Sequence, residues 1–347
     1  ILAGTGEGGI FIYDAKTRER EWKSPEIMRD AHGLAVGDVD GDGEKELVVG
    51  TGYKTDEPWG TIYVFSGRNY SLDAKIERLG SRIRGVALHD IDDDGTIELI
   101  FGTGHSLGER PGEGYIHVYQ FDGKNYTEEW RSQDLNGDPE GLVVEDIDGD
   151  GRYEIVAGNG YRYHSGYLFI FRYSGGMGVG TPPVYEMVFE SEDIGPKAYG
   201  LDAADIDGDG IVEIVVGNQP GYIWIFDGST REVEWKSELL GTDILGIGLY
   251  DIDRDGQIEI IAAQGGYQGK ADFTSAYTTP HIFIIDGRTH AIEERIGEPD
   301  YLAWVFQIVI VCLIVIFLVL LNLRIKRGKV QKAPAQESKE VPSSSKS

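Results

Sequence analysis

The chain has 347 residues, with 59 Asp and Glu against 32 Lys and Arg, and its formal net charge is −27 at pH 7. This acidic excess disfavours nucleic acid or an anionic lipid surface as a partner. The single cysteine, Cys312, rules out an internal disulfide framework and a zinc site built on cysteines.

Residues 1–30 contain three short runs that are typical of β-strands, two largely apolar at 1–5 and 9–14 and a more polar one at 21–24. They match the last three strands of a four-strand unit that recurs further along the chain. The first strand of that unit is missing here. We therefore expect this segment to be a partial unit, with more of the protein upstream.

The acidic nine-residue pattern D-x-D-x-D-G-x-x-E comes next and occurs five times. In each copy three Asp side chains at alternate positions converge, the Gly permits a sharp turn, and the Glu closes the far side. Carboxylates this close repel one another without a cation, and hard oxygen ligands in a tight turn suit calcium. We expect about five structural Ca²⁺ sites. The predicted ligands are Asp38, Asp40, Asp42 and Glu46; Asp90, Asp92, Asp94 and Glu98; Asp146, Asp148, Asp150 and Glu154; Asp205, Asp207, Asp209 and Glu213; and Asp251, Asp253, Asp255 and Glu259.

The context of these loops differs from that of an EF-hand, whose loop of about twelve residues ends on a carboxylate and lies between helices. Here the twelfth positions are apolar, as at Val49 and Phe101. The main-chain carbonyl at the seventh position is a further predicted ligand. The alternative interpretation is that Asp and Gly serve only as turn formers.

Each acidic loop lies between two predicted strands. Runs such as 33–37 precede the loops with small apolar residues, and runs such as 47–50 follow them with β-branched residues and a Gly. A third and a fourth strand come next. Four antiparallel strands repeating every 46 to 59 residues are typical of propeller blades. The predicted fold is all-β, a β-propeller of four-stranded blades with five complete and one partial, followed by a single transmembrane α-helix.

With these hairpins and flanking strands, the sequence resembles the FG-GAP (VCBS) repeats of integrin-α-like β-propellers over roughly residues 1–297. The resemblance implies calcium at positions 1, 3, 5 and 9 of each loop and an extracellular recognition role. The chain lacks the Gly-Phe-Phe-x-x-Arg stretch of integrin α chains. We therefore do not expect a true integrin subunit.

Residues 301–323 form a run without formal charge that is almost entirely apolar. At about 1.5 Å per residue a helix of this length crosses a bilayer once. Acidic residues precede the run and basic residues follow it, which places the propeller outside the cell. The predicted organisation is a propeller ectodomain over 1–300, a transmembrane helix over 301–323 and a disordered basic cytoplasmic tail over 324–347. This is a single-pass protein of the cell membrane.

The connections between second and third strands vary most in length and share one face of the predicted propeller, opposite the acidic loops. Long loops with aromatic and cationic residues on a rigid scaffold are common recognition surfaces. An alternative is that these side chains pack against neighbouring loops. The candidates for the ligand face are Tyr53, Trp59, His105, Arg110, Tyr161, Arg162, Tyr163, His164, Tyr267, Phe273 and Tyr277.

Two further sets of residues recur in register. Asn69 and Asn125 belong to sequons in equivalent turns and are glycosylation candidates, although turn preference alone also explains them. Trp22, Trp130 and Trp235 occupy equivalent positions in three units. Repetition of this kind indicates a role in packing and not in binding a ligand.

We predict a membrane-anchored, calcium-stabilised extracellular propeller for adhesion or surface recognition of a protein or glycan. No catalytic residues are predicted, because there is no nucleophile motif and the seven His are scattered. Two alternatives remain open. One is an exported propeller enzyme acting on polysaccharide, with the Arg162 and His164 loop as its only candidate site. The other is a structural docking component of a cell-envelope complex.

Overall fold

The computed structural model describes residues 2–4, 9–25, 31–52, 60–80, 82–104, 113–160, 165–175, 183–265 and 281–297. The chain divides into a unit of residues 1–297 and a second unit of residues 298–347. Every residue of the second unit lies outside the described ranges, and so do the predicted membrane span 301–323 and tail 324–347. Within the described ranges, no helix has both the length and the apolar composition that crossing a bilayer requires.

The described residues of the first unit form six antiparallel sheets, and within each sheet every strand pairs with the next along the chain. The first sheet has three strands, β1 (Leu2–Gly4), β2 (Ile10–Tyr13) and β3 (Arg20–Lys23). Five four-stranded sheets follow, which we call blades 1 to 5. Blade 1 contains β4 (Ala31–Gly37), β5 (Glu46–Thr51), β6 (Thr61–Phe65) and β7 (Leu72–Glu77), and blade 2 contains β8 (Arg82–His89), β9 (Glu98–Gly104), β10 (Gly114–Phe121) and β11 (Tyr126–Arg131).

The remaining three blades repeat this order of strands. Blade 3 contains β12 (Asp138–Glu145), β13 (Glu154–Gly160), β14 (Gly166–Tyr173) and β15 (Tyr185–Glu190). Blade 4 contains β16 (Ala198–Ala204), β17 (Glu213–Asn218), β18 (Ile223–Asp227) and β19 (Val233–Lys236), and blade 5 contains β20 (Ile244–Tyr250), β21 (Glu259–Gln264), β22 (His281–Asp286) and β23 (Ile292–Gly297). The prediction of repeated four-stranded units after a three-stranded one is confirmed.

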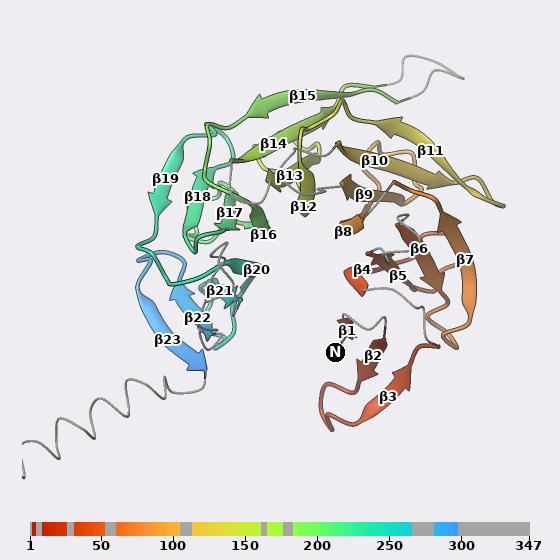
Figure 1. The fold of residues 1–347 in the computed structure, drawn as a ribbon, viewed down its shortest axis with the longest axis horizontal. Coiled ribbons are helices and arrows are strands. Elements are labelled where there is room, and N and C mark those ends of the chain that lie inside the picture. The colour runs from red at the N-terminus through yellow and green to blue at the C-terminus, as the bar shows by residue number, and fades with distance from the viewer. Residues whose placement is uncertain are drawn as a thin grey trace, which may run out of the picture. The chain divides into compact units, whose positions relative to one another are not determined.

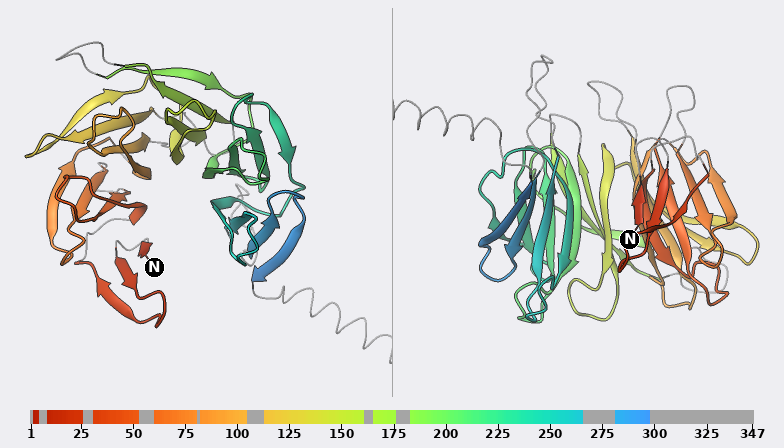
Figure 2. Two further views of the ribbon diagram at one scale, coloured as in Figure 1. Left: turned by 180° about the vertical axis from the view of Figure 1, so that it is seen from behind. Right: turned by 90° about the horizontal axis from the view of Figure 1, so that it is seen from below.

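Within the first unit the sheets follow one another around a common centre, with the first strand of each blade innermost and the fourth outermost (Figures 1 and 2). The inner strands of successive blades approach closely at Gly residues. A Cβ atom at Gly33 would lie 2.5 Å from Cγ2 of Val86, and one at Gly200 would lie 2.6 Å from the backbone nitrogen of Ile247. Equivalent positions meet from blade to blade, so the blades share one direction. All five acidic hairpins therefore lie at the same end of the blades.

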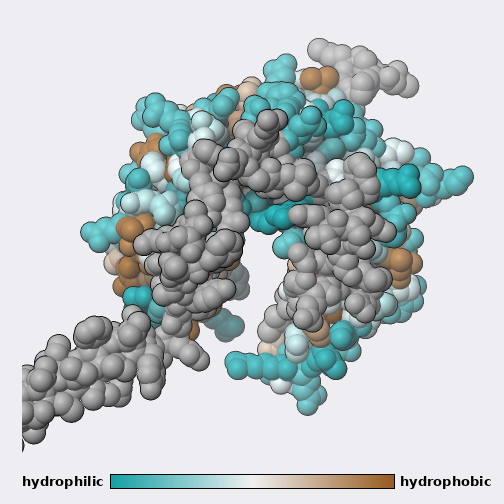
Figure 3. All heavy atoms as spheres, viewed as in Figure 1, coloured by the Kyte–Doolittle hydropathy of each residue, from teal (hydrophilic) through white to brown (hydrophobic). Residues whose placement is uncertain are grey.

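The apolar core lies between neighbouring blades, and the second strand of a blade supplies both of its faces. On β13, Ile155 packs against Ile116 and Val118 of blade 2, while the adjacent Val156 packs against Ile214 of blade 4. A strand buried on both faces has no polar side, so it reads as a continuous apolar run. Described side chains on the face seen in Figure 3 are mostly hydrophilic, with apolar groups at its edges.

The predicted packing of the repeated tryptophans is confirmed. The ring centroid of Trp22 lies 5.6 Å from that of Phe65 in blade 1, and Trp130 lies 5.5 Å from Phe171 in blade 3. Trp235 stacks on His290 of blade 5 at 4.6 Å. Each indole therefore bridges to the next sheet and contributes to the stacking of the blades.

Candidate metal sites in the hairpin loops

Each acidic pattern forms the hairpin between the first and second strands of its blade. We call these hairpins loops 1 to 5, and they cover residues 38–46, 90–98, 146–154, 205–213 and 251–259. The sixth position is a Gly with a left-handed backbone in every loop, with φ between 86° at Gly151 and 94° at Gly210. A side chain at this position is strained, so the pattern requires Gly there. The turn that it creates brings the flanking Asp residues together.

Hydrogen bonds to the backbone fix the first and third Asp of each loop. The first Asp accepts the N–H of the sixth residue at 3.0 Å, as Asp205 does from Gly210, in all five loops. The third Asp accepts the N–H of the seventh residue at 2.8 to 3.0 Å, as Asp209 does from Ile211. These bonds orient the carboxylates toward the interior of the loop without the help of an ion.

The Glu at the ninth position begins the second strand and is buried. Its Oε2 atom accepts the backbone N–H of the second loop residue, at 2.9 Å for Glu98 and Ile91 and at 2.8 Å for Glu213 and Ile206. Burial raises the pKa of Glu98 to about 8 and that of Glu213 to about 7, and the neighbouring Asp charges add to both shifts. Burial likewise raises the pKa of Glu46 to about 7. Loops 1, 2 and 4 without metal therefore disfavour the ionised form of Glu46, Glu98 and Glu213.

Three carboxylates converge in each loop, with one oxygen from each lying within 4.8 Å of the others. In loops 1, 2 and 5 they are the three Asp residues, whereas in loops 3 and 4 they are the first two Asp residues and the Glu. Of the predicted ligands, Glu46, Glu98, Asp150, Asp209 and Glu259 fall outside these groups. The donor set is entirely oxygen, which fits a hard cation such as calcium.

Loops 2 and 3 receive an additional side chain from the third strand of their own blade. Gln120 on β10 donates its amide N–H to Asp94 at 2.8 Å and to Glu98 at 3.2 Å. Arg172 on β14 donates from Nε to Glu154 at 2.7 Å and also contacts Asp148. The acidic pattern gave no signal of these partners, because they lie more than 15 residues away in sequence.

The sequence analysis also did not predict a buried cluster of charged side chains on the inner strands. Arg84 Nη1 of blade 2 lies 2.7 Å from Glu140 Oε2 of blade 3, and Lys197 Nζ beside blade 4 lies 3.6 Å from Glu140 Oε1. Burial raises the pKa of Glu140, and the two cations oppose that shift. The charged side chains of this cluster come from blades 2 and 3 and from the residue just before blade 4, so only the folded arrangement brings them together. The cluster ties neighbouring inner strands to one another.

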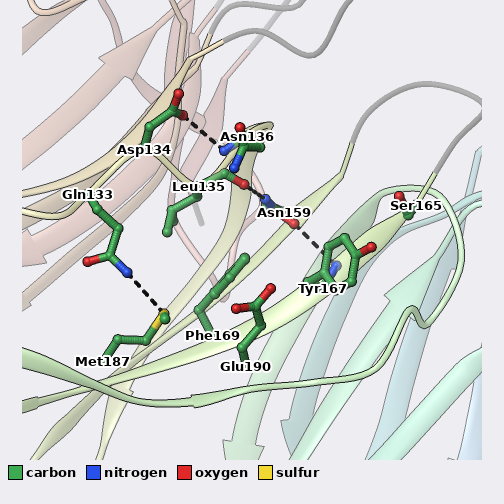
Figure 4. A pocket seen from close by; sticks show the side chains of 10 residues that line it. All are labelled: Gln133, Asp134, Leu135, Asn136, Asn159, Ser165, Tyr167, Phe169, Met187 and Glu190. Atoms are coloured by element: carbon green, nitrogen blue, oxygen red, sulfur yellow. Dashed lines mark hydrogen bonds between the residues drawn. The ribbon is translucent and has the colours of Figure 1, made fainter.

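All eleven candidates for the ligand face lie outside the described residues. Described residues of the β11–β12 connection and of blade 3 form a cavity of about 330 Å³, close to the end of β13 and the start of β14 (Figure 4). Because strand direction alternates, this connection lies at the end of the blade opposite the acidic loops. The cavity is lined by Gln133, Asp134, Leu135, Asn136, Asn159, Ser165, Tyr167, Phe169, Met187 and Glu190.

Several polar groups of this cavity already serve the fold. Asp134 accepts the N–H groups of Gly114 at 3.0 Å and Asn136 at 2.9 Å. Asn159 donates to the carbonyl of Leu135 across the blade boundary. Of the other lining residues, Tyr167 is half-buried and Glu190 is exposed, whereas Phe169 is buried in the apolar core (Figure 4).

The two sequon residues, Asn69 and Asn125, are exposed in turns between third and fourth strands. Asn69 Oδ1 accepts the N–H of Ser71 at 2.8 Å, and Asp122 Oδ1 accepts that of Asn125 at 2.7 Å. Both turns therefore have local hydrogen bonds, as the turn interpretation requires. Use of the sequons for glycosylation stays a prediction.

Comparison with known proteins supports the repeat architecture. The sequence matches the family of FG-GAP-like repeats over residues 146–216 and 205–262, which contain loops 3, 4 and 5. A search among curated proteins gave no match. Among solved structures, the chain is similar to the computationally designed Ika8 protein, with 12% identity, a TM-score of 0.53, and coverage of 85% of this chain and 70% of that one.

A chain of the Mitotic Checkpoint Complex is similar to the same degree, with 12% identity and a TM-score of 0.53. The match covers 86% of this chain and 73% of that one. At such identity these likenesses bear on the fold alone. Residues 146–262 therefore match FG-GAP-like repeats, within an all-β fold of repeated four-stranded blades.

Proposed function

We propose that the protein is a calcium-stabilised propeller for recognition at the cell surface, with Ca²⁺ in its hairpin loops. The observation that carries this proposal is the convergence of three carboxylates in each of five loops at one end of the blades. Burial already disfavours the charge on Glu98, and the Asp charges add to the cost. A divalent cation removes the repulsion and restores the ionised form as the stable one.

The ions are structural in this proposal, and recognition belongs to the opposite end of the blades. The cavity between the β11–β12 connection and blade 3 lies at that end, with the half-buried Tyr167 ring and the exposed Glu190 carboxylate in its lining. Aromatic faces with nearby polar groups suit a sugar ring or a protein surface. An extracellular glycan or protein is therefore the proposed partner. The FG-GAP-like repeats favour the same role in interaction.

Membrane anchoring is part of the proposal and rests on the sequence. The uncharged run 301–323 is long enough for one crossing. Basic residues follow it, which orients the tail toward the cytoplasm and the blades toward the exterior. Protease protection of the tail in sealed vesicles tests this orientation.

Recognition is tested by binding of the full chain to an array of glycans and extracellular proteins, with and without calcium. We expect saturable binding without product, and Tyr167→Ala should weaken it. Tyr115→Ala is the matched control, because Tyr115 is the second residue of β10, as Tyr167 is of β14, but does not line the cavity. Turnover of a polysaccharide would favour the exported enzyme. Unchanged binding by Tyr167→Ala would place recognition elsewhere.

A further inference from the structure

Loop 3 differs from the other acidic loops because a guanidinium group lies against its predicted ligand carboxylates. At loop 1, Arg68 pairs with Glu44, which is not a predicted ligand, and at loop 4, Arg288 donates to the main-chain carbonyl of Asp207 at 2.9 Å. Arg172 Nε lies 2.7 Å from Glu154 Oε1, and its Nη1 lies 3.8 Å from Asp150 Oδ2. Its Nη2 contacts Asp148 Oδ2. One side chain thus touches three of the four predicted ligands of this loop.

A second arginine reaches the same loop from the neighbouring blade. Arg231, which follows β18 of blade 4, places Nη2 at 3.7 Å from Asp148 Oδ2. The turn that carries it packs on the loop, since a Cβ atom at Gly228 would lie 2.3 Å from the Ile147 carbonyl oxygen. Two positive charges therefore lie beside the acidic group of Asp146, Asp148 and Glu154.

The residue on the third strand that pairs with the ninth-position Glu differs between the blades. Glu154 pairs in register with Arg172, whereas Glu213 pairs with Asp227. Glu259 pairs with Asp286, and Asp227 and Asp286 cap their own turns. Among the described third strands of blades 1 to 5, a cation at this position occurs only in blade 3.

The chemistry of arginine separates loop 3 from loop 2, which receives Gln120. A glutamine amide can rotate and offer its oxygen to a metal ion, but a guanidinium has five donors, no acceptor and a permanent charge. An ion entering loop 3 would meet like charge and would have to break the pair with Glu154. The Glu154 side chain is 0% exposed, so breaking that pair would leave a buried charge without its partner.

We infer that the Arg172 side chain serves as the cation of loop 3 and that this loop does not bind calcium. The number of bound calcium ions is then one fewer than the number of acidic groups, which is five. This inference rests on the proposed calcium binding by the other loops. Arg172 neutralises the carboxylates, and Arg231 extends the neutralisation to blade 4. The junction of blades 3 and 4 at this end is thereby held without metal.

The test is the number of Ca²⁺ ions bound per full chain, measured by equilibrium dialysis and atomic emission. We expect four ions for the wild type and one more for Arg172→Gln, which reproduces the residue type present at loop 2. Arg68→Gln is the matched control, because Arg68 pairs with the exposed Glu44 outside the acidic group. The control should leave the number unchanged.

Two ligand variants test the inference without changing the arginine. Asp146→Asn in loop 3 should leave the number of ions unchanged, whereas Asp205→Asn in loop 4 should lower it by one. Five ions in the wild type, or a loss of one ion in Asp146→Asn, would overturn the inference. An Arg172→Gln chain that folds but gains no ion would also overturn it. A wild-type chain that binds no calcium at all would instead overturn the proposed function on which the inference rests.

Discussion

The Oε2 atom of Glu98 lies 2.9 Å from the backbone nitrogen of Ile91, across the mouth of loop 2. The equivalent bond joins the ninth and second residues of the other four loops at 2.8 to 3.3 Å. This Glu therefore has a structural role of its own. It holds the two ends of the hairpin together and satisfies a backbone donor in the interior.

Replacing Glu98 by Ala should destabilise the chain even without metal, by about 1–3 kcal/mol, because the N–H of Ile91 loses its partner. Urea unfolding at pH 6 with EDTA measures this effect. Burial raises the pKa of Glu98 to about 8, so at pH 6 the variant removes little charge and little repulsion. Glu44→Ala is the control, because Glu44 is exposed. Equal unfolding midpoints for both variants would contradict the structural role of Glu98.

The sequence was sufficient to predict the blades because each blade repeats the same local signals. Ile155 and Val156 face different neighbours, and a strand buried on both sides is recognisable as a short apolar run. The loops were predictable for the same reason, since all four carboxylates and the Gly lie within nine residues. Local pattern thus fixes both the strands and the acidic turns.

What the pattern could not predict comes from contacts between distant segments. Arg172 reaches loop 3 from another strand, and Glu140 meets Arg84 from another blade. Each of these residues is unremarkable in its own stretch of sequence. The bulges that shift the register between first and second strands, as between Pro139 and Gly141, also depend on how the blades approach one another.

Removal of calcium should lower the melting temperature of the full chain if the loops hold structural ions. A ligand present at about 100 times its dissociation constant contributes about 2.7 kcal/mol per independent site, so several filled loops produce a large shift. Differential scanning calorimetry in calcium and in EDTA measures it. Magnesium in place of calcium is the control, because its strict octahedral preference fits these flexible oxygen donors less well. Melting that is indifferent to EDTA would argue against filled loops.

Close approach between inner strands gives a prediction that is independent of metal. Gly200→Ala should destabilise the chain by about 1–3 kcal/mol, because the new methyl group would overpack the boundary with blade 5, where the Ile247 nitrogen lies 2.6 Å from its position. Gly248→Ala is the matched control, since a Cβ atom there has nothing within 4 Å. Chemical unfolding in calcium measures both. If the two variants unfold alike, the inner strands are not in such close contact.

The stability of blade 2 should depend on pH through His117, a buried residue on β10. Its Nε2 lies 2.8 Å from the hydroxyl of Thr103 and its Nδ1 lies 2.8 Å from Glu128. Burial lowers the pKa of His117 below its usual value of 6.5, although Glu128 opposes the shift. The unfolded chain therefore takes up this proton at a higher pH than the folded chain does.

It follows from linkage that the contribution of neutral His117 is complete above about pH 6.5 and is lost as the pH falls through the lowered folded-state pKa. His117→Gln keeps hydrogen-bonding groups but does not titrate, so the loss of unfolding free energy between pH 7.5 and 5 should be smaller in the variant. Comparison of the two pH profiles cancels the contributions of the many carboxylates. An NMR titration of the imidazole provides the direct measurement, and a folded-state pKa above 6.5 would contradict the prediction because it would show that Glu128 outweighs burial.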